Sequence, residues 1–217
     1  MILNPISAIQ VGRLAWNNRR NIKKIYHTAG VTVSDLMEPR LDQLILSAAR
    51  ELEIQPAVPK AIFSIESRLV ALGENGLPLI RIEPHWWRKL TGRRTEKIRN
   101  PRSQDARWKT FELLLSIDEE AAIRSTSFGL PQMMGFNHRA CGFKSPQLFL
   151  EDMKSGAPAQ VIAFKRFVRS NRRLHQAMKD HDLRKIAHHY NGPKYRRNQY
   201  DTKLANAIER YRHDFVA

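Results

Sequence analysis

Residues 61–83 read AIFSIESRLVALGENGLPLIRIE. The stretch up to Ser67 has apolar residues at helical spacing, which predicts the end of an amphipathic helix. The pair Asn75-Gly76 then predicts a two-residue turn, since both positions accept positive φ, and apolar residues flank it on both sides. We therefore expect a helix followed by a small β-hairpin over residues 69–83.

Helical patterns extend from this stretch in both directions. Apolar residues recur at helical spacing over residues 41–52, and every segment after residue 83 carries helical signals, including a helix expected to begin near Ser127. Ser145 and Asp182 are predicted N-caps, because their side-chain oxygens can accept hydrogen bonds from the first turn. The expected fold class is mainly α, with one small β-hairpin after an early helix.

The charge balance points to an anionic partner. The 217 residues include 37 Lys and Arg against 21 Asp and Glu, a formal net charge of +16. Such a chain is attracted to nucleic acid, an anionic membrane surface or the bacterial envelope, and charge alone favours nucleic acid. We interpret residues 1–38 as a basic arm that is solvated or docks on anionic envelope polymers, and residues 39–217 as the folded domain.

Cysteine usage and the start of the sequence indicate a cytoplasmic origin. Cys141 is the single cysteine, so no intramolecular disulfide forms, and a lone cysteine is more often a small buried residue than a nucleophile. Asn4, Pro5 and Ser7 interrupt any apolar core of a signal peptide. We expect synthesis in the cytoplasm without a signal peptide, so a substrate outside it requires release of the protein.

Three short motifs occur in the order known from one enzyme superfamily. Residues 64–67 read SIES, residues 127–134 read SFGLPQMM, and residues 187–193 read AHHYNGP. They resemble the Glu-Ser, Gly-Leu-x-Gln-x-Met and Tyr-Asn-Gly-Pro motifs of the goose-type lysozyme and lytic transglycosylase superfamily. Each motif alone is weak evidence, but the ordered set is fairly specific.

The sequence is most similar to one branch, the N-acetylmuramidase domain common in phage endolysins. The segments LIRIEPH (79–85) and YRRNQYD (195–201) resemble that branch, and the resemblance extends over residues 42–212. It implies a lysozyme-like α fold and cleavage between N-acetylmuramic acid and N-acetylglucosamine of bacterial peptidoglycan. We also expect a monomer. Arg68 and Leu69 depart from the family, which has glycines there, so the path into the hairpin is expected to differ.

Glu66 is the candidate general acid. Cleavage of a glycosidic bond needs a proton donor for the leaving oxygen, and a carboxyl in an apolar pocket has its pKa raised so that it can donate near neutral pH. Glu66 follows five mostly apolar residues and lies where a helix ends. The alternative for a lone glutamate at a helix end is simple exposure to solvent.

Glu83 is the candidate second carboxylate, because the hairpin would fold it back toward Glu66. It would act as a base that activates water or as an electrostatic stabiliser, or else as a structural acid paired with His85 or an arginine. The remaining substrate-binding candidates are Ser127, Gln132, Tyr190, Asn191 and His85. The alternative roles are a structural amide for Gln132 and a helix C-cap for Asn191 with the glycine after it.

No metal site or cofactor is expected. His188 and His189 are adjacent and therefore point to different faces of a helix, and zinc-type ligand spacing is missing from the sequence. Trp86 and Trp87 would stack on sugars or pack as core residues. Two other functions stay open: a lytic transglycosylase, which forms 1,6-anhydro products, and a basic nucleic-acid-binding protein, which the charge alone would favour.

Overall fold

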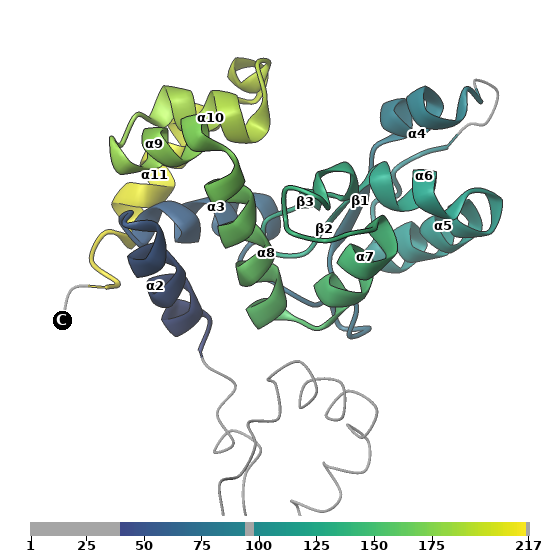
Figure 1. Ribbon diagram of the computed structural model, residues 1–217, viewed down its shortest axis with the longest axis horizontal. Helices are drawn as coiled ribbons and strands as arrows, with labels where there is room; N and C mark the ends of the chain where they lie inside the picture. Colours follow the sequence, from purple (N-terminus) through teal and green to yellow (C-terminus); the bar gives the residue numbers. More distant parts are fainter. Residues whose placement is uncertain (1–39, 94–97, 216–217) are drawn as a thin grey trace, which may run out of the picture. The chain divides into compact units, whose positions relative to one another are not determined.

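The computed structural model describes residues 40–93 and 98–215. The predicted arm, residues 1–38, therefore lies outside the described residues. The helices are α2 (Leu41–Leu52), α3 (Ala57–Ser67), α4 (Pro84–Thr91), α5 (Gln104–Ile117), α6 (Glu119–Arg124), α7 (Pro146–Lys154), α8 (Ala157–Ser170), α9 (Arg172–Lys179), α10 (Leu183–Asn191), α11 (Tyr200–Tyr211), with 3-10 turns η1 (Gly135–Asn137) and η2 (Tyr195–Asn198). The strands are β1 (Ile80–Ile82), β2 (Thr126–Phe128) and β3 (Met133–Met134). The predicted mainly α fold class is confirmed (Figure 1).

Local sequence signals account for the ends of several helices. The hydroxyl of Ser145 accepts a hydrogen bond from the Leu148 amide at the start of α7, and Asp182 caps α10 through the Lys185 amide, as predicted. Helix α3 ends at Ser67, so Glu66 lies in its last turn, also as predicted.

The exit from α3 keeps a backbone conformation that normally requires glycine. Arg68 and Leu69 have φ values of 57° and 64°, and the Leu69 amide donates to the Phe63 carbonyl at 3.3 Å, as in a Schellman-type helix end. Because side chains with a Cβ resist this conformation, the two residues store strain. The chain therefore keeps the left-handed conformation although Arg68 and Leu69 stand where the family has glycines, and the conformational energy of this segment is higher.

The sheet differs from the predicted hairpin. Asn75 and Gly76 do form a turn, but the ladder across it is reduced to one bridge between Leu72 and Pro78. Strand β1 pairs instead with β2, and β2 pairs with β3, both antiparallel. The helix expected near Ser127 is therefore wrong, because the segment is held by pairing with a strand some 45 residues away in sequence.

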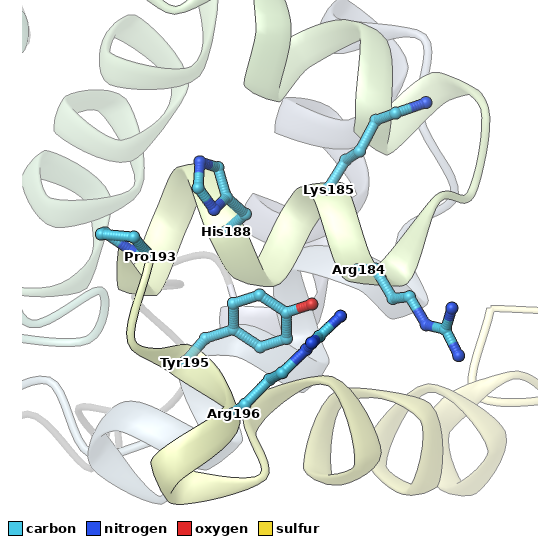
Figure 2. A pocket seen from close by; sticks show the side chains of 6 residues that line it. All are labelled: Arg184, Lys185, His188, Pro193, Tyr195 and Arg196. Carbon is cyan, nitrogen blue, oxygen red and sulfur yellow. The ribbon is translucent and has the colours of Figure 1, made fainter.

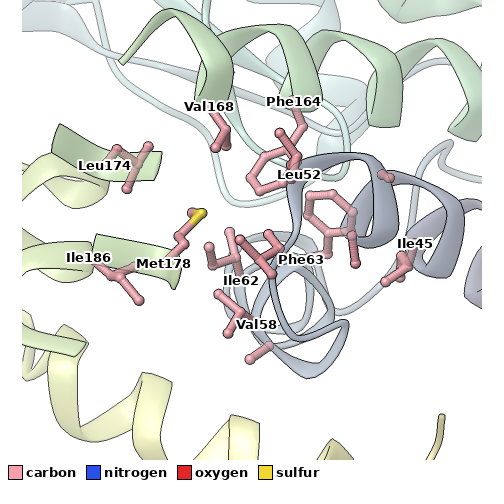
Figure 3. Packing of buried hydrophobic residues seen from close by; sticks show 14 of the residues in the cluster. Ile45, Leu52, Val58, Ile62, Phe63, Phe164, Val168, Leu174, Met178 and Ile186 are labelled. Atoms are coloured by element: carbon pink, nitrogen blue, oxygen red, sulfur yellow. The ribbon is translucent and has the colours of Figure 1, made fainter. Parts of the chain in front are cut away.

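Two large apolar clusters lie on either side of the sheet, and a small third one is formed by Ala187, Tyr195 and Tyr200. In Figure 1, α4 to α7 gather beside the strands on one side, and α2, α3 and α9 to α11 lie on the other. Figure 3 shows the second group meeting around Ile62, Phe63 and Phe164, all fully buried. Each such side chain contributes about 1.5–3 kcal/mol on burial. Phe167 contacts both clusters and so links them.

Helix α11 packs along α3 and is fixed to it by polar contacts. The buried Lys60 ammonium bonds to carboxylates of Asp42 and Asp214, each at 2.7 Å, and Ser64 shares a hydrogen bond of 2.9 Å with the Tyr211 hydroxyl. These contacts tie the end of the chain to the helix that carries Glu66. They fix the register in which α11 presents its first residue, Tyr200, to that carboxyl.

A helix that crosses a bilayer needs about 20 mostly apolar residues. Within residues 40–93 and 98–215, no helix is long and apolar enough to cross a membrane.

Candidate active site

Glu66 lies in a partly buried position beside Tyr200. The Tyr200 hydroxyl donates a hydrogen bond of 2.8 Å to Glu66 Oε1. Burial raises the pKa of the Glu66 carboxyl from 4.5 to about 7, against the opposing effects of the Tyr200 hydrogen bond and of the charges of Arg81 and Lys203. A carboxyl with such a pKa is largely protonated just below neutral pH, so it can serve there as a proton donor.

A chain of contacts joins the three sequence motifs at this point. The ring of Tyr200 stacks on that of Tyr190, with centroids 6.4 Å apart, and the Tyr190 hydroxyl donates to the Pro131 carbonyl at 2.7 Å. Burial, followed by the charge of Glu66, raises the pKa of both tyrosines well above the usual value, so both hydroxyls stay protonated donors. Segments 64–67, 127–134 and 187–193 are therefore neighbours in space.

The side chains of Ser127 and Gln132 bind each other and the backbone. The Gln132 amide nitrogen donates to the carbonyls of Leu79 and Gly129, at 3.0 and 2.9 Å, and its oxygen accepts from Ser127 at 2.9 Å. Both amide protons are thus used within the protein. This geometry supports the structural alternative for Gln132, whose side chain joins the β2–β3 turn to the residue before β1.

A second glutamine, Gln160 of α8, is hydrogen-bonded to the same turn. Its fully buried side chain donates to the carbonyls of Ala71 and Met153, and its oxygen accepts from the Leu130 amide at 2.7 Å. A Cβ at Gly129 would lie 2.4 Å from the Gln160 Cδ atom, and Gly129 has a φ of +68°. Glycine is therefore required here both by space and by backbone conformation.

Glu83 forms an ion pair in front of β1. Its Oε1 lies 2.8 Å from Arg81 Nε, and its Oε2 lies 3.6 Å from His85 Nδ1. Both predicted partner types, a histidine and an arginine, are therefore present. The charge of Arg81 also lowers the pKa of Glu66, so this arginine acts on both carboxyls. Arg81 therefore links Glu83 electrostatically to Glu66.

The other candidates lie at the edges of this region. Asn191 is exposed at the last position of α10, and the amide of Gly192, with a φ of +99°, caps the helix by donating to the His188 carbonyl. Trp87 is fully buried and is a core residue, whereas Trp86 is partly exposed, with its ring 4.6 Å from that of Phe136.

Cys141 is a buried core residue. Burial raises the pKa of the Cys141 thiol to about 12, so the buried cysteine stays protonated, in line with the expectation of a small core residue. The described residues contain no group of three or more His, Cys, Asp or Glu side chains that could hold a metal ion.

Three residues of this region were missed as site residues by sequence reasoning. Tyr200 was noted only as part of the similar tail, and Arg81 carries no local signal. Gln160 did carry one: it lies four residues before Phe164 and eight before Val168, so it interrupts the apolar face of α8. A polar residue in such a position must find internal hydrogen-bond partners.

A mainly helical domain with a small sheet and a partly buried, protonatable glutamate at a helix end defines the lysozyme-like class of glycosidases. A family model of N-acetylmuramidases matches residues 55–212, and the chain belongs to this family. It is thus a glycosidase of the N-acetylmuramidase type, with peptidoglycan as its substrate. The family match supports the enzymatic prediction and not the nucleic-acid-binding alternative.

A solved structure is also similar to the chain. The crystal structure of the Burkholderia AP3 phage endolysin shares 29% sequence identity with it at a TM-score of 0.67, and the match covers 80% of this chain and 70% of that one. No curated protein matches the sequence.

Proposed function

We propose that the protein is a phage endolysin in which Glu66 is the general acid. The main support for this proposal is the state of the Glu66 carboxyl. It is partly buried, it accepts a hydrogen bond from Tyr200, and its pKa is raised to about 7. The similarity to a phage endolysin supports the biological role. Such an enzyme would be made in the host cytoplasm and reach the wall after release.

In the proposed reaction, Glu66 transfers its proton to the glycosidic oxygen that links N-acetylmuramic acid to the next sugar. The C–O bond breaks as positive charge develops on the sugar ring, and water adds to the anomeric carbon. Tyr200 holds Oε1 of Glu66, which keeps the carboxyl in place. After transfer, the hydrogen bond from Tyr200 and the charge of Arg81 stabilise the carboxylate, because both lower its pKa.

We assign Glu83 to the activation of water. Arg81 orients its carboxylate through one oxygen, while the 3.6 Å contact with His85 is longer than a hydrogen bond and leaves the second oxygen able to accept a proton. In the rival role, the Arg81–Glu83 pair only fixes the start of α4. Replacement of Glu83 by Gln separates the two, because a water-activating base is needed for turnover and a structural acid is not.

The remaining candidates would shape the sugar site. Tyr190 would present its ring, since its hydroxyl is bound to Pro131, and Asn191 would contact the sugar from the exposed end of α10. Ser127 and Gln132 would act through the backbone that they hold. His85, exposed beside Glu83, would contact substrate directly.

The test is the release of products from purified peptidoglycan by wild type, Glu66→Gln and Glu83→Gln, with Glu112→Gln as the control for loss of an exposed carboxylate. We expect Glu66→Gln to lose about 10²–10⁴-fold in kcat, the usual contribution of a general acid, and the control to match wild type. Product masses should show reducing ends with added water. Activity of Glu66→Gln equal to that of the control would refute the assignment, and 1,6-anhydro ends would show a lytic transglycosylase.

A further inference from the structure

A basic hollow lies beside α10, outside the contacts described above. It has a volume of about 360 Å³ and is lined by Arg184, Lys185, His188, Pro193, Tyr195 and Arg196 (Figure 2). Three of these six side chains are permanent cations, and none is acidic. This volume is at the lower end of the range for pockets that bind small ligands. It is larger than the volume that a bare ion needs.

The arrangement of α10 explains why the cations gather there. Ile186, Ala187 and Tyr190 turn to the core, so Arg184, Lys185 and His188 fall on the outer face. Figure 2 shows Arg196, from η2, lying against the ring of Tyr195 on the opposite wall; its guanidinium carbon is 5.8 Å from the ring centroid.

The charge of the hollow is only partly neutralised. Lys185 pairs with Asp182 at 2.8 Å, and the pKa of Arg196 is raised first by its hydrogen bond with Tyr195 and also by the charge of Asp201. Within the described part of the chain, neither Arg184 nor Arg196 has a carboxylate at ion-pair distance. The pKa of nearby His189 is lowered, first by burial and also by the charges of Arg173 and Lys185. A guanidinium in such a place favours a carboxylate, which it can bind with two parallel N–H donors.

The hollow is separated from Glu66 by one layer of side chains. Tyr195 packs in a buried cluster with Ala187 and Tyr200, and Tyr200 is the residue that bonds to Glu66. A helix with its side chains is about 10 Å across, so the two sites face opposite sides of α10 and its following turn. Because Tyr195 and Tyr200 lie between the hollow and Glu66, we expect a substituent of the bound sugar, and not the sugar itself, to reach the hollow.

We propose that this hollow binds the carboxylates of the peptide stem that peptidoglycan carries on its muramic acid residues. An extended stem of four residues spans about 14 Å, which is enough to pass from the sugar site around the end of α10. The inference rests on the proposed function, since it assumes that a muramic acid residue binds beside Glu66. It assigns to Arg184 and Arg196 a part in substrate recognition that is independent of the proton transfer.

The experiment measures binding in the Glu66→Gln background, so that the substrate stays intact. Co-sedimentation gives the Kd for purified peptidoglycan and for the same glycan stripped of its stems by an amidase. Added Arg184→Gln and Arg196→Gln substitutions should reduce the preference for the stem-bearing material about tenfold, as expected for two partly exposed charge contacts. The control carries Arg102→Gln and Arg139→Gln, which remove the same charge from exposed positions elsewhere.

The possible outcomes separate the two proposals. A loss of preference in the Arg184/Arg196 variant and not in the control supports the inference. An unchanged preference, or an equal loss in the control, overturns it. A third sample, cell walls that still carry phosphate polymers, tests a phosphate as the ligand. If the variant binds more weakly only to these walls, the inference is also overturned. Cleavage by Glu66→Gln at the rate of the Glu112→Gln control would instead count against the proposed function. All the substituted arginines are exposed, so the fold should be retained, and matching melting temperatures would verify this.

Discussion

Replacing Glu66 by Gln should stabilise the folded protein at alkaline pH while it lowers kcat by about 10²–10⁴-fold. Burial raises the carboxyl pKa from 4.5 in the unfolded chain to about 7 in the folded protein, so the folded state binds this proton more tightly. Wild-type stability is therefore highest below pH 4.5 with respect to this group, and falls as the pH rises toward 7 and above. A neutral glutamine avoids that loss and can still accept the Tyr200 hydrogen bond.

The size of the effect follows from the pKa difference. A shift of about 2.5 units at 1.36 kcal/mol per unit corresponds to about 3 kcal/mol, the most that Glu66→Gln should gain over wild type at pH 8. At pH 4 the same substitution should change the unfolding free energy little, because both side chains are then neutral. The other titrating groups change the unfolding free energy of both proteins equally, so their contribution cancels when the two proteins are compared at the same pH.

Urea denaturation at pH 4, 6 and 8 provides the measurement. The unfolding free energies of wild type, Glu66→Gln and the exposed control Glu112→Gln are compared at each pH. The difference for Glu66→Gln should grow as the pH rises, whereas that for the control should stay flat. A difference for Glu66→Gln that is independent of pH, or a loss of stability at pH 8, would refute the argument that burial holds this carboxyl neutral.

Three further changes have defined outcomes. Tyr200→Phe removes a hydrogen bond that lowers the pKa of Glu66, so the alkaline limb of the kcat/KM profile should move up by about one pH unit and kcat should fall; a downward shift would contradict this role. Arg68→Gly should raise the unfolding free energy by about 0.5 kcal/mol in urea, because relief of left-handed strain slightly exceeds the added freedom of the unfolded chain; a loss above that amount would argue against strain. Gly129→Ala should cost about 3 kcal/mol in the same assay, since the new Cβ meets Gln160; a neutral result would mean that the turn adapts freely.

Local signals in the sequence predicted the parts of the fold that depend on neighbouring residues. Apolar spacing identified α2 and α3, and the caps Ser145 and Asp182 marked the starts of two later helices. The position of Glu66 at the end of α3 followed from the same pattern. These elements depend on contacts within a few residues, which a single sequence displays directly.

The sheet could not be predicted in this way. Strands β2 and β3 have three and two residues, too few for an alternating pattern to stand out. They exist because β1 pairs with β2 and because Gln132 and Gln160 supply hydrogen bonds to the turn between them. Such contacts join residues that are far apart in the sequence.

The candidate site also combines residues that the sequence indicated with one that only distant contacts bring into place. The resemblance selected Glu66, Ser127, Gln132 and Tyr190, and the structure brings their segments together. The direct partner of Glu66 escaped notice, because Tyr200 lies 134 residues further along the chain and reaches the carboxyl only through the packing of α11 on α3. A contact of that kind becomes visible only once the helices are placed.

Burial should keep the Glu66 carboxyl protonated just below neutral pH in the folded enzyme. Its titration can be followed by the ¹³C chemical shift of the side-chain carboxyl, assigned from the signal that disappears in Glu66→Gln. We predict a midpoint of about 7, well above the 4.5 of an unperturbed glutamate. A midpoint near 4.5 would contradict the account.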